Sequence, residues 1–248
     1  MLQCSDMNES SNENMGGQTI GRTSFAIPVA IIIGFGLIAA SIYFSGGKPT
    51  TTLPETEDVD TKELSSVTPV SEQDHIRGNP NAKLVVVEYS DFDCPYCKSF
   101  HTTMQRISEE YGPGGNVAWI YRHFPLTSLH PSSAYIAEAS ECVAQVGGND
   151  AFWKFADLVF AERSINEPTN VARLPEFAEI AGVSQTDYEA CISSGRGKAK
   201  VEADAQNAVA TGGQGTPHSI ILIGGQTMLI NGAQPYEVVK QMIDGLLK

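Results

Sequence analysis

The sequence is short of positive charge. Its 248 residues carry 16 Lys and Arg against 29 Asp and Glu, which gives a formal net charge of -13. A nucleic-acid-binding surface needs clustered basic residues, so this balance argues against a nucleic-acid partner. Five cysteines are too few for a miniprotein held together by disulfides, and no repeat at a solenoid or propeller period is visible. The chain length is sufficient for one sizeable domain with appendages.

Charged residues are also absent from one stretch of twenty, Phe25 to Phe44, with the sequence FAIPVAIIIGFGLIAASIYF. That length is sufficient to span a bilayer as a helix. A cleaved signal peptide is the alternative, but signal peptides have a shorter apolar core behind a positive start. Here the preceding residues offer only Arg22 as a cation. We therefore predict an uncleaved transmembrane helix over 25–44. Arg22 and Lys48 flank its two ends, so charge does not decide its orientation.

The segments on either side of this apolar stretch are polar. Residues 1–24 are rich in Asn, Ser and Gly, which predicts a disordered tail in which Cys4 is a free thiol. Residues 45–70 combine Gly, Pro, Thr and acidic residues, which predicts a flexible linker. The folded domain is therefore expected over 71–248.

Periodicity within this domain predicts alternating strands and helices. The expected elements are strands at 83–89 and 117–121 with a helix between them that ends at Gly112-Pro113, a helical block over about 127–212, a hairpin of 219–223 and 228–230, and a last helix that Pro235 opens. This order predicts an α/β layer sandwich with an α-helical subdomain inserted in its middle.

Two of the five cysteines, Cys94 and Cys97, stand three positions apart in DFDCPYCKSF. Cys97 falls on the apolar face of the predicted helix, and Cys94 directly precedes Pro95, which favours the first helical position. Cys94 is therefore expected at the helix N-terminus, where backbone N–H groups and the helix dipole stabilise a thiolate. Such sites lower a cysteine pKa to about 3.5–7.5. The pattern is typical of an exposed attacking cysteine and a shielded resolving cysteine.

Metal binding is the main alternative for this pair. Zinc needs four ligands, usually from a second cysteine pair or two closely spaced histidines. The five histidines contain no such pair: His75, His101, His123, His130 and His218. A Cu(I) site on the two thiolates stays open, although a well-placed third ligand is lacking. An inert staple is disfavoured, because so short a loop removes little entropy from the unfolded chain.

The stretch VVVEYSDFDCPYC before a helix, and GTPHSIIL much later, resemble the DsbA-like thiol:disulfide oxidoreductases. The resemblance covers about 70–248 and implies a thioredoxin fold with an inserted α-helical subdomain, preceded here by one N-terminal transmembrane helix. It implies that Cys94 is the nucleophile and Cys97 the resolving thiol, with Pro95 and Tyr96 as the variable pair that tunes the redox poise. DsbA has Pro-His at those two positions, so the missing histidine predicts a milder oxidant.

Three further residues receive roles from the resemblance. Thr216-Pro217 matches the family's cis-proline loop, where an extended substrate pairs with the backbone beside the disulfide. Glu88 matches an acidic group that is buried beneath the active site and handles protons for Cys97. The structural alternatives are an ordinary trans X–Pro turn and a surface glutamate on an edge strand.

Cys142 and Cys191 fall on apolar helix faces within the helical block. Two separate buried thiols are one interpretation. We favour a structural disulfide, which an oxidising location permits and which would stabilise the fold by about 4 kcal/mol through its long loop.

The remaining expectations concern rings near the predicted site. For His123 the alternatives are packing beneath the active site and a satisfied structural histidine, and we favour the second. We expect His101 to be solvated, because it lies off the apolar face of its helix. His218 is a weaker candidate for substrate contact. Phe92 and Tyr96 are expected to form an exposed apolar patch for unfolded clients.

Together these observations predict a membrane-anchored oxidoreductase that donates the Cys94–Cys97 disulfide to exported proteins with free thiols. The resemblance implies reoxidation by a quinone-linked membrane partner, and no cofactor or metal is required. This chemistry places the catalytic domain on the extracytoplasmic side of the cell membrane in a single-pass protein, with residues 1–24 in the cytoplasm. The alternatives are an isomerase or reductase with the same residues, and a Cu(I) metallochaperone on the same fold.

Overall fold

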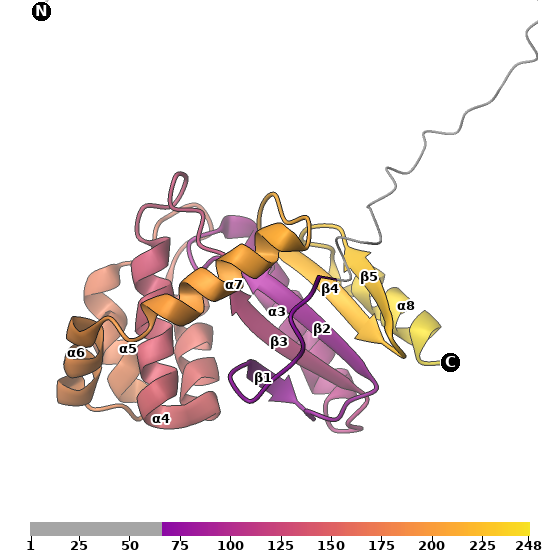
Figure 1. Cartoon of the computed structure of the whole chain (residues 1–248), viewed down its shortest axis with the longest axis horizontal. Coiled ribbons are helices and arrows are strands. Elements are labelled where there is room, and N and C mark those ends of the chain that lie inside the picture. The colour runs from indigo at the N-terminus through magenta and orange to yellow at the C-terminus, as the bar shows by residue number, and fades with distance from the viewer. Residues whose placement is uncertain (1–65) are drawn as a thin grey trace, which may run out of the picture. The chain divides into compact units, whose positions relative to one another are not determined.

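A five-stranded mixed sheet forms the centre of the described part of the chain, residues 66–248 of a computed structural model (Figure 1). The strands are β1 (His75–Gly78), β2 (Leu84–Ser90), β3 (Val117–His123), β4 (His218–Ile223) and β5 (Gln226–Ile230), in the spatial order β1-β3-β2-β4-β5. β2 and β3 are parallel, and the other neighbouring pairs are antiparallel. Periodicity predicts four of these strands and misses β1, which is too short to show alternation.

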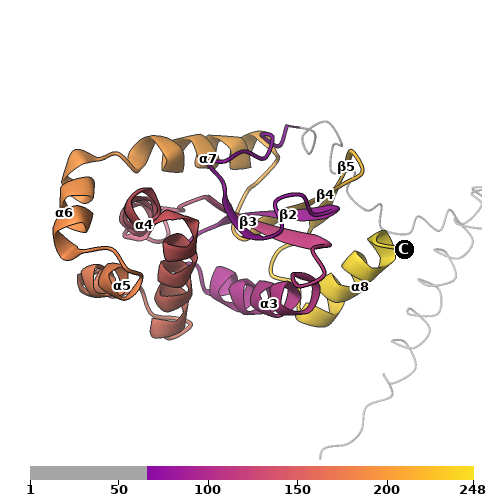
Figure 2. The same ribbon diagram turned by 90° about the horizontal axis from the view of Figure 1, so that it is seen from below.

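Helices cover both faces of this sheet. They are α3 (Pro95–Tyr111), α4 (Ser133–Glu162), α5 (Leu174–Ile180), α6 (Gln185–Ser194), α7 (Lys198–Ala210) and α8 (Tyr236–Leu246), with a 3-10 turn at Val171–Arg173. α3 and α8 lie on one face and α7 on the other, while α4, α5 and α6 gather to one side (Figure 2). α4 to α7 stand between β3 and β4 in the chain. The expected thioredoxin fold with an inserted helical subdomain is therefore confirmed.

β2 is the middle strand, and its side chains alternate between the two faces. Leu84 and Val86 pack in the core that contains residues of α3 and α8, whereas Val87 and Tyr89 pack in the core that contains Ala208 of α7. Glu88 follows Val86 on the first face and is fully buried. The central position of β2 excludes the edge-strand alternative for this glutamate.

Two sequence signals shape the helical insertion. Gly148 has φ 80° and ψ -174° inside α4, so this long element is two helices joined at a kink where a Gly-Gly pair predicts a stop. Cys142 on α4 and Cys191 on α6 are joined by a disulfide with an S–S distance of 2.05 Å. The structure therefore contains the favoured disulfide, which links two helices of the insertion.

The folded domain includes residues before 71, where the linker is predicted to end. The backbone N–H of Thr68 donates to Asn207 Oδ1 at 3.0 Å, and Asn207 Nδ2 donates to the Ser66 carbonyl at 2.8 Å. Residues 66–68 are thus attached to α7 and are not part of a flexible linker. The predicted tail and transmembrane helix lie outside the described residues. Within 66–248, no helix has the length and apolar character needed to cross a bilayer.

Candidate active site

Cys94 is the residue that precedes the first turn of α3. Its backbone is extended, with φ -72° and ψ 126°, and Pro95 opens the helix behind it. The Cys94 carbonyl accepts the N–H of Lys98 at 3.1 Å, which is the first hydrogen bond of the helix. Because no side chain caps this N-terminus, its free N–H groups are available to the Cys94 sulfur. The predicted helix-start position is confirmed.

The cis-proline loop lies against this sulfur. The Thr216–Pro217 peptide bond is cis, and the Cys94 thiol donates to the Thr216 carbonyl at 3.4 Å. On the other side, the Asp91 N–H donates to Cys97 Sγ at 3.5 Å. The trans-turn alternative is therefore excluded, and residues more than a hundred positions apart are brought together at the cysteine pair.

The residues around the cysteine pair differ in how much of each is exposed to solvent. Tyr96 is 68% exposed, whereas Cys94 is only 4% exposed and Cys97 is fully buried. The expected exposure of Cys94 is therefore wrong for the residue as a whole, because the cis-proline loop covers it. Phe92 is also buried, since its ring stacks on Tyr121 at a centroid distance of 5.1 Å. Of the predicted apolar patch, only Tyr96 is on the surface.

The two thiols have opposite electrostatic environments. The pKa of Cys94 is lowered to about 6, chiefly by a hydrogen bond with the Cys97 side chain, which together with Thr216 and the backbone N–H groups of Tyr96 and Cys97 outweighs the opposing effect of burial. Burial raises the pKa of Cys97 well above its ordinary value, and the hydrogen bond with Cys94 adds to this rise. The site therefore holds one thiolate and one protonated thiol near neutral pH.

Glu88 is buried on the same face of the sheet as Trp119 and Tyr121. Its Oε2 accepts the Trp119 indole N–H at 2.9 Å. Burial raises the Glu88 pKa to about 7, and the Trp119 hydrogen bond opposes this rise. A carboxyl group with this pKa exchanges protons at neutral pH. Its negative charge also contributes to the raised pKa of Cys97, so the two groups interact.

Sequence reasoning missed the groups that fix the cysteine loop. Arg163, at the end of α4, donates through Nη2 to the Cys94 carbonyl at 2.6 Å and through Nε to the Phe92 carbonyl at 3.2 Å. Asp91 Oδ2 pairs with His130 Nδ1 at 2.9 Å and accepts the Leu126 N–H at 2.8 Å. No local spacing in the sequence connects these segments, so only the packing of the insertion against the sheet reveals them.

The histidines differ from expectation in one case. His101 is buried, because α4 covers its side of α3 and Asp157 Oδ1 lies 2.7 Å from His101 Nε2. The expectation that it is solvated is wrong. His123 is buried and its Nε2 lies 2.8 Å from Glu141 Oε1, as expected for a structural histidine. His218 Nε2 lies 3.1 Å from the Thr211 hydroxyl.

A third metal ligand beside the cysteine pair is not found in the described part of the chain. The one group of three potential ligands identified within 66–248 consists of His75, His123 and Glu141, and contains neither Cys94 nor Cys97.

Comparison with known proteins agrees with this geometry. The model of the family described as Thioredoxin matches residues 70–245. The chain belongs to the thioredoxin family. The helical insertion between β3 and β4 and the C-x-x-C pair at the start of α3 are the features that the resemblance to DsbA-like proteins predicts for this fold.

Solved structures share the fold of this thioredoxin-family chain. Oxidised BdbD from Bacillus subtilis has a TM-score of 0.63 and 22% identity, covering 72% of this chain and 95% of BdbD. Pseudomonas aeruginosa DsbA2 has a TM-score of 0.59 and 24% identity, covering 72% of this chain and 96% of DsbA2. The catalytic domain of Proteus mirabilis ScsC has a TM-score of 0.57 and 22% identity, covering 75% of this chain and 94% of that domain.

One curated relative is named for a different activity. The Na(+)/H(+) antiporter NhaA 3 of Salinispora tropica is 31% identical over 170 residues, which is 67% of this chain and 23% of the antiporter. The chain thus spans less than a quarter of that relative. The similarity concerns one part of the antiporter and assigns no transport activity to this chain.

Proposed function

We propose that this thioredoxin-family chain is a thiol:disulfide oxidoreductase that donates the Cys94–Cys97 disulfide to exported client proteins. The observation that carries the proposal is the contrast between the two thiols. Cys94 precedes the first turn of α3 and lies against the Thr216 carbonyl, with a pKa lowered to about 6, whereas Cys97 is fully buried and its pKa is raised well above its ordinary value. A stabilised thiolate favours the reduced pair and therefore makes the disulfide a better oxidant. At pH 7, a fall in the Cys94 pKa from 9.0 to about 6 corresponds to about 30 mV of reduction potential.

The exchange proceeds in two balanced steps. A client thiolate attacks Cys94 Sγ, forms a mixed disulfide and releases Cys97 as a thiolate, which takes a proton. A second client thiolate then attacks the client sulfur of the mixed disulfide and releases Cys94 as a thiolate. The client loses two electrons and the Cys94–Cys97 pair gains them. Because a thiol of low pKa is a good leaving group, the second step is favoured by the environment of Cys94.

Glu88 supplies the proton in the first step. With a pKa of about 7, it is partly protonated at neutral pH and can protonate the Cys97 thiolate beside it. It takes a proton back when the dithiol is reoxidised. The Thr216 carbonyl, 3.4 Å from Cys94 Sγ, lies where an extended client segment would pair with the backbone.

The setting of this reaction is part of the proposal. A disulfide donor needs an oxidising compartment, so the domain is proposed to face the extracytoplasmic side, anchored through residues 25–44. Its dithiol is proposed to be reoxidised by a quinone-linked membrane partner. No cofactor within the chain is needed, because every electron moves between sulfur atoms.

The reduction potential of Cys94–Cys97 tests the donor proposal. The full chain is equilibrated in glutathione buffers, and the two redox forms are separated after alkylation, with Cys94→Ser as the control that forms no active-site disulfide. We expect a value between the about -270 mV of thioredoxin and the about -120 mV of DsbA. A value at or below about -270 mV contradicts the donor function and makes the chain a reductase.

An isomerase is the second candidate, favoured by Tyr96 and Thr216. The Pro-Tyr pair resembles that of glutaredoxins and of an isomerase relative, and a Thr before the cis-proline is shared with isomerases and reductases. Scrambled ribonuclease distinguishes the two activities. If the chain is an isomerase, its dithiol form restores the activity of scrambled ribonuclease. If it is a donor, only its disulfide form is active, and it reactivates only reduced ribonuclease.

A further inference from the structure

Three side chains that can bind metals meet beside the sheet, apart from the cysteine pair. His75 belongs to β1, His123 ends β3 and Glu141 lies on α4. Glu141 Oε1 is 2.6 Å from His75 Nε2 and 2.8 Å from His123 Nε2. All three residues are buried, and their potential ligand atoms lie within 4.8 Å of one another.

The orientation of both imidazoles is fixed by aromatic packing. The ring of Phe152 stacks on His75 with a centroid distance of 3.6 Å and an interplanar angle of 10°. Tyr121 and Phe152 contact His123 edge-on, at centroid distances of 5.4 and 6.2 Å. Because these rings prevent rotation, the two Nε2 atoms stay aimed at the same carboxylate oxygen.

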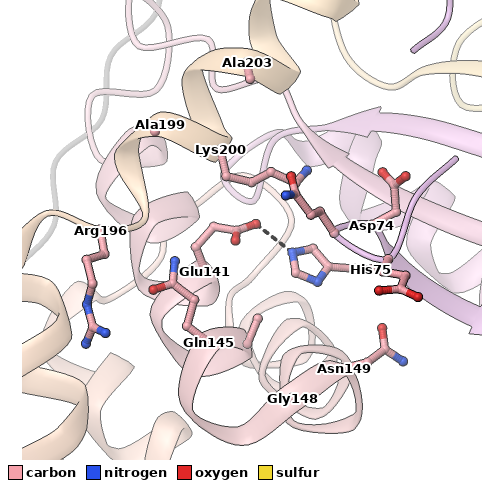
Figure 3. A pocket seen from close by; sticks show the side chains of 13 residues that line it. Asp74, His75, Glu141, Gln145, Gly148, Asn149, Arg196, Ala199, Lys200 and Ala203 are labelled. Atoms are coloured by element: carbon pink, nitrogen blue, oxygen red, sulfur yellow. Dashed lines mark hydrogen bonds and ion pairs between the residues drawn. The ribbon is translucent and has the colours of Figure 1, made fainter. Parts of the chain in front are cut away.

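A cavity of about 600 Å³ opens against this cluster. His75 and Glu141 line it, together with residues of α4, α7 and the segment before β1 (Figure 3). A metal bound by these residues would therefore keep a coordination position that water or a small ligand can reach. This differs from a closed structural site, in which the protein supplies all four ligands.

The charges around the cavity leave the Glu141 carboxylate available. Lys200, which also lines the cavity, pairs with Asp204 Oδ2 at 2.6 Å. Asp74 pairs with Arg122 at 2.8 Å. These two ion pairs are internally neutral, whereas Glu141 has only the two histidines as partners among the interactions found for its side chain.

We infer that His75, His123 and Glu141 bind a divalent transition-metal ion of the Zn²⁺ class, with the remaining position facing the cavity. Two imidazoles and one carboxylate with an open position form a donor set that zinc uses in proteins. Zinc bonds of about 2.0–2.2 Å in a tetrahedral arrangement place ligand atoms about 3.3 Å apart. The present distances of 2.6 and 2.8 Å would therefore widen modestly on binding.

This site is independent of the proposed disulfide exchange. Its members come from β1, β3 and the insertion, so a bound ion would join the helical subdomain to the sheet. The alternative is a metal-free cluster in which both imidazoles donate Nε2–H to Glu141. The two arrangements differ in the ring nitrogen that carries the proton, because Nε2 must lose its proton to bind a metal and the proton then lies on Nδ1.

Zinc titration of the full chain without a polyhistidine tag tests the inference. Cys4, Cys94 and Cys97 are replaced by Ser, so that free thiols do not compete for the ion. Equilibrium dialysis is expected to give one Zn²⁺ per chain. His75→Gln and Glu141→Gln are each expected to weaken binding at least tenfold, whereas the matched control His101→Gln is expected to leave it unchanged. His101 is also a buried histidine paired with a carboxylate, but it lies outside the cluster.

A second measurement needs no substitution in the cluster. The imidazole nitrogens of His75 and His123 are followed by ¹⁵N NMR while Zn²⁺ is added to the same thiol-free chain. We expect the protons to move from Nε2 to Nδ1 in these two rings. The inference is overturned if both rings keep Nε2–H at saturating Zn²⁺, if the chain binds no stoichiometric Zn²⁺, or if the two cluster variants bind it undiminished.

Discussion

The Trp119 indole donates its N–H to Glu88 Oε2 at 2.9 Å, on the buried face of the sheet beneath the start of α3. This hydrogen bond stabilises the ionised carboxylate, but burial destabilises the ionised carboxylate more strongly. The Glu88 pKa is therefore raised from 4.5 to about 7. Glu88 therefore changes its charge in the pH range in which the cysteine pair works. Both the stability of the fold and the rate of exchange should depend on this side chain.

Glu88→Gln is expected to stabilise the fold at alkaline pH. The carboxyl is protonated in both states below the unfolded pKa of about 4.5, and its ionisation costs stability as pH rises through the folded pKa of about 7. The wild type should lose about 2–3 kcal/mol relative to the variant between about pH 5 and pH 8. Urea unfolding at both pH values measures this, with the exposed Glu179→Gln as control. A difference that is constant with pH contradicts the raised pKa.

The same variant is expected to slow thiol exchange through Cys97. The amide of the Glu88→Gln variant can still accept the Trp119 N–H but carries no exchangeable acid, so Cys97 loses its proton donor and acceptor. General acid-base catalysis of this kind contributes about 10²–10⁴ in rate, and we expect at least a tenfold loss near pH 7. Stopped-flow reduction by a client peptide measures it. Unchanged rates with an unchanged pH profile would show that Glu88 is only structural.

Local patterns predicted the parts of the fold that depend on neighbouring residues. Pro95 set the start of α3, Gly112 its end, and the Gly-Gly pair the kink in α4. The burial of Glu88 was also predictable, because it lies in a continuous β-branched run that a central strand requires.

Features that depend on packing between distant segments were not predictable in this way. His101 lies at the margin of the apolar face of α3, and only the approach of Asp157 on α4 makes it a buried residue. Arg163 reaches Cys94 across 69 positions. The His75–Glu141 contact spans 66 positions, so no motif spacing could indicate the cluster.

Tyr96→His is expected to make the disulfide more oxidising. Tyr96 is 68% exposed, so the fold tolerates the change, and the Pro-His pair of DsbA stabilises the thiolate. A tenfold stabilisation of the Cys94 thiolate raises the potential by about 30 mV. Equilibration with glutathione measures this change, and Tyr96→Phe serves as the control for loss of the phenol. An equal potential in the two variants would mean that the histidine does not act on Cys94.

Replacement of Cys142 and Cys191 by Ala is expected to lower stability without abolishing exchange. The two residues are separated by 49 positions, and a loop of that length corresponds to about 4 kcal/mol in the chain-entropy model. Denaturant unfolding measures the loss, while the client assay should keep its wild-type rate below the unfolding transition. Loss of exchange in the folded variant would instead place this disulfide in the redox pathway.

Arg163→Met is expected to raise the Cys94 pKa. The buried guanidinium holds the Cys94 carbonyl at 2.6 Å, and its positive charge and the Cys94 thiolate stabilise each other. Loss of a nearby opposite charge raises the pKa of an acidic group by roughly one pH unit or more. A rise of the Cys94 pKa from about 6 to about 7 would lower the potential at pH 7 by about 20 mV.

Thiolate absorbance against pH gives the pKa of Cys94 directly. Arg173→Met is the control, because it removes an arginine whose partners are Glu162 and Glu176. If Arg163 only holds the loop in place, the variant loses stability but the pKa of Cys94 does not change. If the pKa of Cys94 rises and the reduction potential falls together, Arg163 acts electrostatically on the reacting sulfur.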